Sequence, residues 1–160
     1  MSAEPRPTRT PLKTFLHVLA IAVTGIAMTY GVGLATKAHL LVPLAAPLGI
    51  GLVLAMCWLP RRTQLIGWSV LTVWLLSTVY LGSGALEPVA LVVVVVLSLA
   101  AVLRSPWFLV AVWALHPVWD LAVPRVLPEA RHDLPLGCLI YDLVVAAYLV
   151  WWTVRASRRR

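Results

Sequence analysis

Residues 86–103, LEPVALVVVVVLSLAAVL, decide the class of fold. Five consecutive valines occupy positions 92–96, and in a soluble protein such a run indicates a buried strand. Here apolar residues continue on both sides of the valines, so the run is too long for a strand. A transmembrane α-helix needs about 20 mainly apolar residues. The segment therefore predicts a helix that crosses a membrane.

Five further runs of similar length and composition lie elsewhere in the chain. They are Phe15–Thr36, Leu40–Leu59, Thr63–Leu81, Pro106–Val123 and Leu134–Val154. We therefore predict an all-α fold, a polytopic membrane bundle of six transmembrane helices.

The composition argues against a soluble domain. Of the 160 residues, 61% are hydrophobic and 12% are charged, whereas a soluble domain has about 45–50% apolar and about 25% charged residues. Lipid can face such an apolar surface and water cannot. We expect residues 1–160 to form a single membrane domain. Within it, residues 1–13 should be a disordered cytoplasmic tail and residues 155–160 a basic cytoplasmic tail.

The basic residues predict how the helices are oriented. With the N-terminus inside, ten of the 13 Lys and Arg residues fall in cytoplasmic segments, and only Lys37, Arg125 and Arg131 fall in outer segments. Cytoplasmic loops carry an excess of Lys and Arg. We therefore expect both termini in the cytoplasm and a multi-pass protein of the bacterial inner membrane, with the lipid bilayer as its partner. This pattern also explains the net charge of +7 without nucleic acid as a partner.

The first two runs are less regular than the others. The run Phe15–Thr36 follows basic residues, as a signal peptide would, but it is longer than a signal-peptide core, so we expect a retained helix. In the second run, Pro43, Pro47, Gly49 and Gly51 crowd the first half. Each proline removes one backbone hydrogen bond, so we expect a kink there.

Three ionisable residues lie inside the apolar runs of the last third of the chain. They are His116, Asp120 and Asp142. A charge at the centre of a membrane costs about 2.5–3.5 kcal/mol on insertion scales, so such residues face a partner or a cavity. His116 and Asp120 are four residues apart and share one helical face. We therefore predict that these three residues form a catalytic site.

The predicted depths of these residues match. At about 1.5 Å per residue, Asp142 lies about 12 Å from the outer start of its helix, His116 about 10 Å and Asp120 about 5 Å from the outer end of theirs. Consecutive antiparallel helices are usually neighbours. The polar faces should therefore meet in the outer half of the membrane. The remaining predicted pocket residues, which would bind substrate, are Trp113, Trp119, Tyr141, Glu87 and Tyr80.

Two carboxylates and a histidine can handle protons. A carboxyl group kept from water can hold its proton at neutral pH, and a nearby imidazole can accept or pass one. A protonated Asp would then act as a general acid toward an alkene or epoxide, and aromatic walls would stabilise a developing cation. We therefore hypothesise a membrane-bound enzyme of the cyclase or isomerase type, acting on a lipophilic small molecule such as an isoprenoid (terpenoid) compound.

Other interpretations use the same residues. They include a polar clamp between helices, worth about 0.6 kcal/mol per contact, and a small ion- or proton-coupled carrier. A carrier of this size would require a homo-oligomer, because six helices are few for alternating access. A structural or accessory subunit without chemistry is a further alternative. A divalent metal on His, Asp and Cys138 is chemically reasonable, but no compact ligand motif is present, so we predict no cofactor.

Two short motifs in this region resemble a known family. His116-x-x-Trp119-Asp120, followed by Cys138-x-x-x-Asp142 in the last helix, resembles a family of small uncharacterised bacterial integral membrane proteins, over roughly the last third of the chain. In that family further histidines follow the Trp-Asp pair, whereas residues 121–124 here read LAVP. This departure argues against a metal site, and the resemblance implies no particular activity.

Overall fold

A computed structural model describes residues 11–80, 86–122 and 134–158. Within these ranges the chain forms six α-helices and no strand. They are α1 (Pro11–Lys37), α2 (Leu41–Cys57), α3 (Arg61–Tyr80), α4 (Glu87–Leu103), α5 (Trp107–Ala122) and α6 (Leu134–Ser157). The prediction of an all-α fold with six helices is confirmed.

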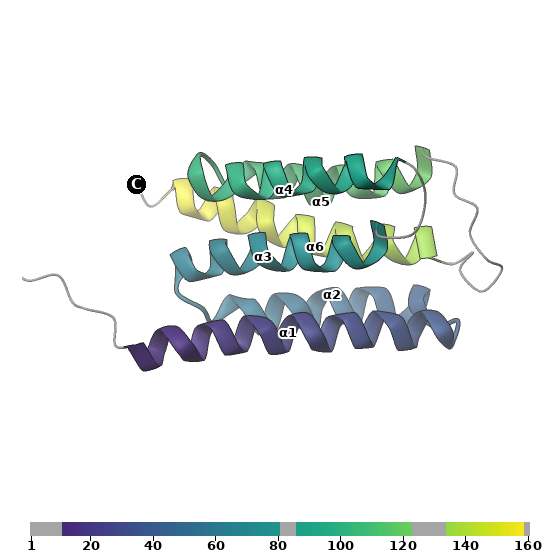
Figure 1. The fold of residues 1–160 in the computed structure, drawn as a ribbon, viewed down its shortest axis with the longest axis horizontal. Helices are drawn as coiled ribbons and strands as arrows, with labels where there is room; N and C mark the ends of the chain where they lie inside the picture. The colour runs from purple at the N-terminus through teal and green to yellow at the C-terminus, as the bar shows by residue number, and fades with distance from the viewer. Residues whose placement is uncertain (1–10, 81–85, 123–133, 159–160) are drawn as a thin grey trace, which may run out of the picture.

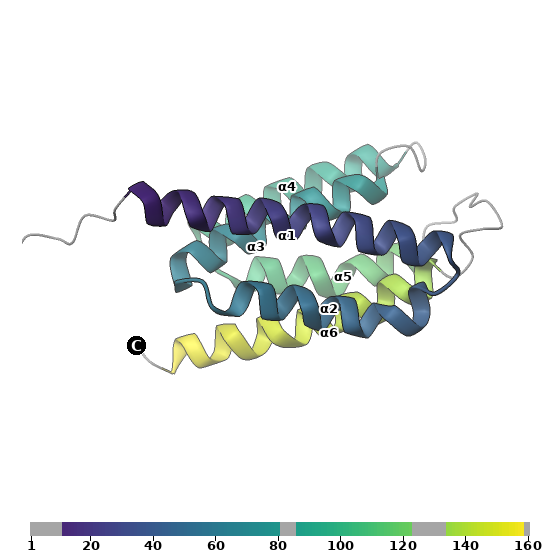
Figure 2. The same cartoon turned by 90° about the horizontal axis from the view of Figure 1, so that it is seen from below.

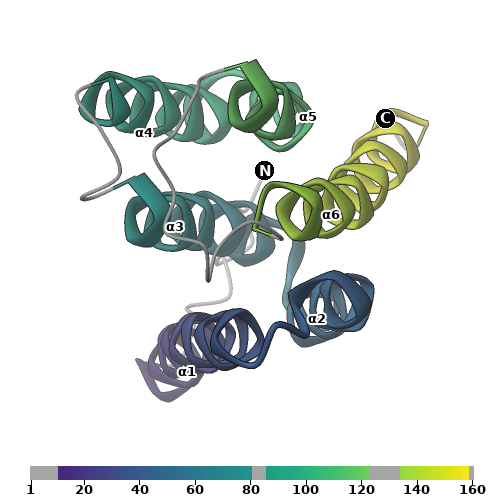
Figure 3. The same ribbon diagram turned by 90° about the vertical axis from the view of Figure 1, so that its right-hand side faces the viewer.

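The six helices lie lengthwise beside one another in a bundle (Figures 1 and 2). Seen along the bundle, they form three stacked pairs, α4 with α5, α3 with α6, and α1 with α2 (Figure 3). The start of α1 and the end of α6 lie at one end of the bundle, which we call the terminal end. The corner at residues 38–40 lies at the opposite end, which we call the distal end. The expected antiparallel arrangement of α5 and α6 is present, and these two helices pack against each other.

The helix boundaries differ from the predicted ones mainly at the terminal end. Helix α1 begins at Pro11, so residues 11–13 of the expected tail are helical. Proline suits the first turn of a helix because its missing N–H has no intrahelical partner there. Helix α6 continues to Ser157, into the expected basic tail. Residues 1–10 of the predicted N-terminal tail lie outside the described residues.

A tight corner joins α1 to α2 at the distal end. The backbone of His39 is left-handed, with φ 55°. The Leu40 amide donates to the carbonyl oxygen of Ala35 at 2.8 Å, and the His39 amide donates to that of Thr36 at 3.2 Å. This pair of bonds is the Schellman pattern that ends helices. Lys37, predicted in an outer loop, is therefore the last residue of α1.

Helix α2 is continuous despite its prolines. Pro47 lies inside the helix, where it leaves the carbonyl of Pro43 without its usual amide donor. Gly49 allows α2 to lie close to α6, since an added Cβ there would be 3.1 Å from Val144 Cγ1 and 3.3 Å from the carbonyl oxygen of Tyr141. Of the residues that predicted an irregular helix, Gly49 is therefore the one that packs closely against a neighbouring helix, while Pro43 and Pro47 are exposed.

The terminal half of the bundle is tightly packed. Its buried side chains include Trp68, Met56, Leu109 and Leu149. The rings of Trp68 and Tyr148 have centroids 5.8 Å apart. Gln64, also buried, donates from Nε2 to Tyr148 Oη at 2.6 Å and to the carbonyl oxygen of Met56 at 3.1 Å. This half therefore holds a polar contact between packed helices.

In the described part of the chain, many large apolar side chains are exposed and ten polar or charged residues are buried within a mainly apolar core. Large apolar side chains are exposed along α1 and α4, including Phe15 and Val92, which are 61% and 62% exposed. The buried polar residues are Thr24, Gln64, Ser69, Thr72, Glu87, Ser98, His116, Asp120, Asp142 and Thr153. Of the described helices, α1 and α6 are long and apolar enough to cross a membrane, while α2, α4 and α5 are shorter apolar helices.

Candidate functional site

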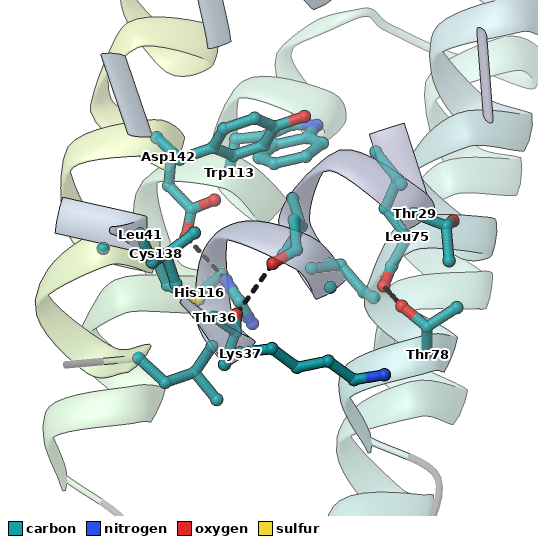
Figure 4. Close-up of a pocket in the computed structure, with 16 residues that line it drawn as sticks. Thr29, Thr36, Lys37, Leu41, Leu75, Thr78, Trp113, His116, Cys138 and Asp142 are labelled. Carbon is teal, nitrogen blue, oxygen red and sulfur yellow. Dashed lines mark hydrogen bonds and ion pairs between the residues drawn. The ribbon is translucent and has the colours of Figure 1, made fainter. Parts of the chain in front are cut away.

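A cavity of about 320 Å³ lies in the distal half of the bundle (Figure 4). Five helices line it. The lining residues are Thr29, Val32, Gly33, Thr36 and Lys37 of α1, Leu41 of α2, Leu75, Leu76 and Thr78 of α3, Trp113 and His116 of α5, and Leu134, Gly137, Cys138, Tyr141 and Asp142 of α6. The volume is at the lower end of the range of about 300–1,000 Å³ seen for small-molecule sites. The cavity therefore has room for a small ligand.

His116 and Asp142 meet at the wall of this cavity. His116 Nδ1 lies 2.6 Å from Asp142 Oδ2, and both side chains are 2% exposed. Figure 4 shows the two side chains directed toward one another across the interface between α5 and α6. A distance of this size is typical of a charge-assisted hydrogen bond. The predicted meeting of these two residues is present in the structure.

Asp120 lies on the other side of the His116 ring. Its Oδ1 is 3.5 Å from His116 Nε2, one helical turn along α5, and its side chain is fully buried. Asp120 is not among the residues that line the cavity. Each nitrogen of the imidazole therefore faces a different carboxylate, and only the Asp142 side of this chain of groups borders the cavity.

Two aromatic residues form part of the wall beside this chain. The rings of Trp113 and Tyr141 have centroids 5.9 Å apart at an interplanar angle of 49°. Trp113 is held in place because its Nε1 donates to Thr72 Oγ1 at 2.9 Å, and Thr72 Oγ1 donates to the carbonyl oxygen of Trp68 at 2.7 Å. Tyr141 is only 8% exposed, and its hydroxyl has no hydrogen-bond partner in the described part of the chain. An unsatisfied buried hydroxyl at a cavity wall indicates a place for a polar group of a ligand.

The other predicted pocket residues lie elsewhere. Trp119 is half-buried and packs against the cluster of Leu76, Ala90, Val94 and Val112, facing α4, so it does not line the cavity. The prediction placed it in the pocket because it adjoins Asp120, but adjacent residues of a helix do not share a face.

Glu87 is buried at the start of α4, and it does not line the cavity either. Tyr80 is the last residue of α3, and its side chain lies outside the described part of the chain.

Sequence reasoning missed the contribution of α1. Thr29, Gly33 and Thr36 follow a spacing of four and then three residues, which places them on one helical face. All three line the cavity, and Lys37 follows them. The spacing of these small and hydroxyl residues within an apolar run could have predicted that α1 lines a polar site.

The described residues provide no cluster suited to a metal ion. Across residues 11–80, 86–122 and 134–158, no group of three or more His, Cys, Asp and Glu side chains has that arrangement. Cys138, proposed as a softer ligand, lines the cavity and is half-buried.

Comparison with known proteins gives one finding. No curated protein and no solved structure matches this chain. A family of unknown function, DUF6010, matches residues 38–156, which cover five of the six helices. The match extends well beyond the two motifs in α5 and α6. The chain therefore belongs to the DUF6010 family.

Proposed function

We propose that the chain crosses a lipid bilayer six times and that its distal half holds an active site for a lipophilic substrate. The membrane part of the proposal is supported by the exposed apolar side chains of α1 and α4 and by the burial of polar residues. The largest apolar patch of a soluble monomer covers about 300–600 Å². Exposed apolar residues along whole helices exceed what water tolerates.

The charges of the two ends support an orientation. The described basic residues of the terminal end are Lys13, Arg61, Arg62, Arg104, Arg155 and Arg158, while the distal end has Lys37. Arg61 lies over the Trp152 ring at 5.4 Å, and Arg155 lies over the Trp151 ring at 5.1 Å. Such Arg and Trp pairs suit a membrane interface. We infer that the terminal end faces the cytoplasm of a bacterial cell.

Labelling of single cysteines tests this topology. Cys57 and Cys138 are replaced by serine, and one cysteine is introduced as His39→Cys at the distal corner or as Ser157→Cys at the terminal end. Both positions are exposed. A membrane-impermeant maleimide should label His39→Cys in intact cells and should label Ser157→Cys only after lysis. Labelling of both in intact cells would contradict the proposed topology.

The proposed reaction is proton transfer to and from the substrate. The observation that carries it is the contact of 2.6 Å between His116 Nδ1 and Asp142 Oδ2 at the wall of an otherwise mainly apolar cavity. A general acid must lie within hydrogen-bond reach of the atom that it protonates, and both members of this pair border the cavity. Asp120, behind the imidazole, would supply or remove the proton from the other ring nitrogen.

An isomerisation or cyclisation of an alkene balances with these groups alone. The proton held by the pair adds to one alkene carbon, where the π electrons form the new C–H bond and leave a carbocation. The faces of Trp113 and Tyr141 stabilise this charge by cation–π attraction. Loss of a proton from a neighbouring carbon to the same pair forms the new double bond. The proton is returned and no oxidant or reductant is consumed.

Isotope exchange tests this reaction. Membranes containing the wild-type protein are incubated in D₂O with a lipid extract, and products are separated by chromatography and mass spectrometry. We expect a product of changed retention time that carries one deuterium, and we expect Asp142→Asn to abolish it. Tyr148→Phe, which removes a polar contact from the same helix outside the cavity, should leave product formation unchanged. A product that still forms with Asp142→Asn would overturn the proposed role of the pair.

Melting curves separate loss of catalysis from loss of folding. If Asp142→Asn melts as the wild type does but makes no product, the pair acts in the reaction. If neither the wild type nor Asp142→Asn forms a deuterated product, and Asp142→Asn has lost most of its thermal stability, the polar-clamp interpretation replaces the enzyme proposal.

A further inference from the structure

The cavity has a cationic group at its distal end. Among the described residues that line the cavity, Lys37 is the only Lys or Arg. In the described part of the chain, no carboxylate forms an ion pair with it. Figure 4 shows the Lys37 side chain extended at the same end of the cavity as Thr36 and Thr78. The position of its Cα is fixed by the hydrogen-bonded corner that ends α1.

The hydroxyl groups near Lys37 are already engaged as donors. Thr29 donates to the carbonyl oxygen of Gly25, Thr36 to that of Val32 and Thr78 to that of Leu75. These threonines therefore offer only acceptor lone pairs to the cavity. Among the cavity residues at this end, Lys37 alone offers a charged donor.

Apart from the His116–Asp142 pair, the opposite part of the cavity is apolar and aromatic, with one unsatisfied hydroxyl. Tyr141 lies seven residues into α6, which corresponds to a depth of about 10 Å from the distal start of that helix. Its buried hydroxyl has no partner in the described ranges. A ligand that satisfies both ends needs an anionic head at Lys37 and a short apolar body that reaches Tyr141 and the His116–Asp142 pair.

We infer that the cavity binds an anionic amphiphile, a phosphate or carboxylate head on a short hydrocarbon body, with the head held by Lys37. This inference rests on the proposed function, because it takes the cavity as the place where substrate meets the His116–Asp142 pair. It adds the charge of the substrate and the residue that selects it. Lys37 is exposed, and a hydrogen bond between two charged groups is strong enough to change affinity by about tenfold.

Binding of decyl phosphate tests the inference. The dissociation constant is measured by calorimetry for protein in nanodiscs of zwitterionic phosphatidylcholine, with empty nanodiscs as the background. We expect decyl phosphate and decanoate to bind at least about tenfold more tightly than decanol. Lys37→Met should remove this preference and Lys37→Arg should keep it. Equal binding of decanol and decyl phosphate, or wild-type affinity in Lys37→Met, overturns the inference.

Two matched variants separate the cavity from the membrane surface. Lys13→Met removes a charge from the other end of the same helix and should leave binding unchanged; an equal loss with Lys13→Met would mean non-specific attraction. An added Cβ at Gly33 meets no atom within 4 Å, so Gly33→Leu should fold and fill the cavity. Gly33→Leu should abolish binding. Persistence of binding in Gly33→Leu would place the anion at the lipid headgroups and overturn the inference.

Inorganic phosphate distinguishes an amphiphile from a free anion. We expect inorganic phosphate alone not to displace decyl phosphate at matched concentration, and displacement would overturn the amphiphile. Tyr148→Phe, which lies outside the cavity, should still bind decyl phosphate. If decyl phosphate binds as expected while no deuterated product forms, the proposed reaction fails and the ligand class stands. If product forms while Lys37→Met binds normally, the ligand class fails and the reaction stands.

Discussion

The two halves of the bundle each hold a polar side-chain contact to α6, but the contacts have different surroundings. In the terminal half, Gln64 and Tyr148 are neutral, lie 2.6 Å apart and are surrounded by packed side chains. In the distal half, His116 and Asp142 are also 2.6 Å apart, but they are ionisable and border a cavity. A structural role, as a link between helices, is enough to account for the neutral contact of Gln64 and Tyr148. An ionisable contact that faces open volume needs a second reason, and the proposed proton transfer would be one.

The largest expected effect is on the rate of product formation, after a change at His116. His116→Gln keeps a polar side chain of similar length but cannot pass a proton between Asp120 and Asp142. Loss of a general acid or base lowers a rate by about 10²–10⁴-fold, so we expect product formation in the D₂O assay to fall by this factor.

Gln64→Leu is the matched change in the terminal half. We expect it to lower the stability by about 1 kcal/mol, because it removes the hydrogen bonds that the buried Gln64 amide donates to the half-buried Tyr148 hydroxyl and to the Met56 carbonyl oxygen, and to leave the rate of product formation unchanged. A smaller loss of rate with His116→Gln than with Gln64→Leu would show that both contacts are structural.

The next largest effect compares two buried tryptophans. Replacement of a buried Trp by Ala costs about 3–5 kcal/mol when the ring is packed on all sides. Trp68 is fully buried in the packed cluster, so we expect Trp68→Ala to lose this amount. Trp113 belongs to the same cluster, but it also borders the cavity, and a ring with open volume on one side gives up fewer contacts. Trp113→Ala should therefore cost about 2 kcal/mol or less, measured by unfolding in detergent. Equal losses would mean that the cavity wall is as tightly packed as the terminal core.

The sequence predicts the parts of this comparison that depend on one helix or on two consecutive ones. The six apolar runs give the six helices, and the spacing of four between His116 and Asp120 gives their common face. The meeting with Asp142 follows because α5 and α6 are consecutive and antiparallel. These inferences need only helix geometry and short connections.

The rest of the site depends on contacts between helices that are distant in sequence. Lys37 and Thr29 reach the cavity because α1 packs beside α3, and Leu41 reaches it because α2 packs along α6. Hydropathy does not specify which non-consecutive helices become neighbours, because the six runs are similarly apolar. The position of Lys37 also required the corner at His39, a left-handed residue that composition does not mark as a turn. For these two reasons, the packing of α1 and the corner at His39, the sequence alone did not predict that Lys37 lines the cavity.

Gly137 and Gly51 have different surroundings, so they should respond differently to an added methyl group. An added Cβ at Gly137, in the cavity wall, would lie 2.5 Å from Leu41 Cγ, which is a branched atom close to its own backbone. We expect Gly137→Ala to cost about 1–3 kcal/mol by overpacking and to lower decyl phosphate affinity, because α2 and α6 must separate there. At Gly51 of α2 an added Cβ would only approach Met28 Cε at 4.0 Å. Gly51→Ala should be neutral or stabilise by up to about 1 kcal/mol. A destabilising Gly51→Ala would contradict this account of the helix contacts.

The smallest effect concerns the corner that positions Lys37. His39 has φ 55°, a conformation that costs an L-residue about 1–2 kcal/mol. His39→Gly removes this strain, but the greater freedom of glycine in the unfolded chain disfavours folding by about 0.5–1 kcal/mol. We therefore expect stability to change by less than about 1 kcal/mol and ligand affinity to be kept. His39→Val adds a β-branched side chain that tolerates this conformation poorly. It should lower the melting temperature. It should also weaken decyl phosphate binding by a larger factor than Gln64→Leu does, because the end of α1 that carries Lys37 would fray. If His39→Val binds decyl phosphate as the wild type does, the corner does not position Lys37, and the cationic end of the cavity is set by the membrane instead.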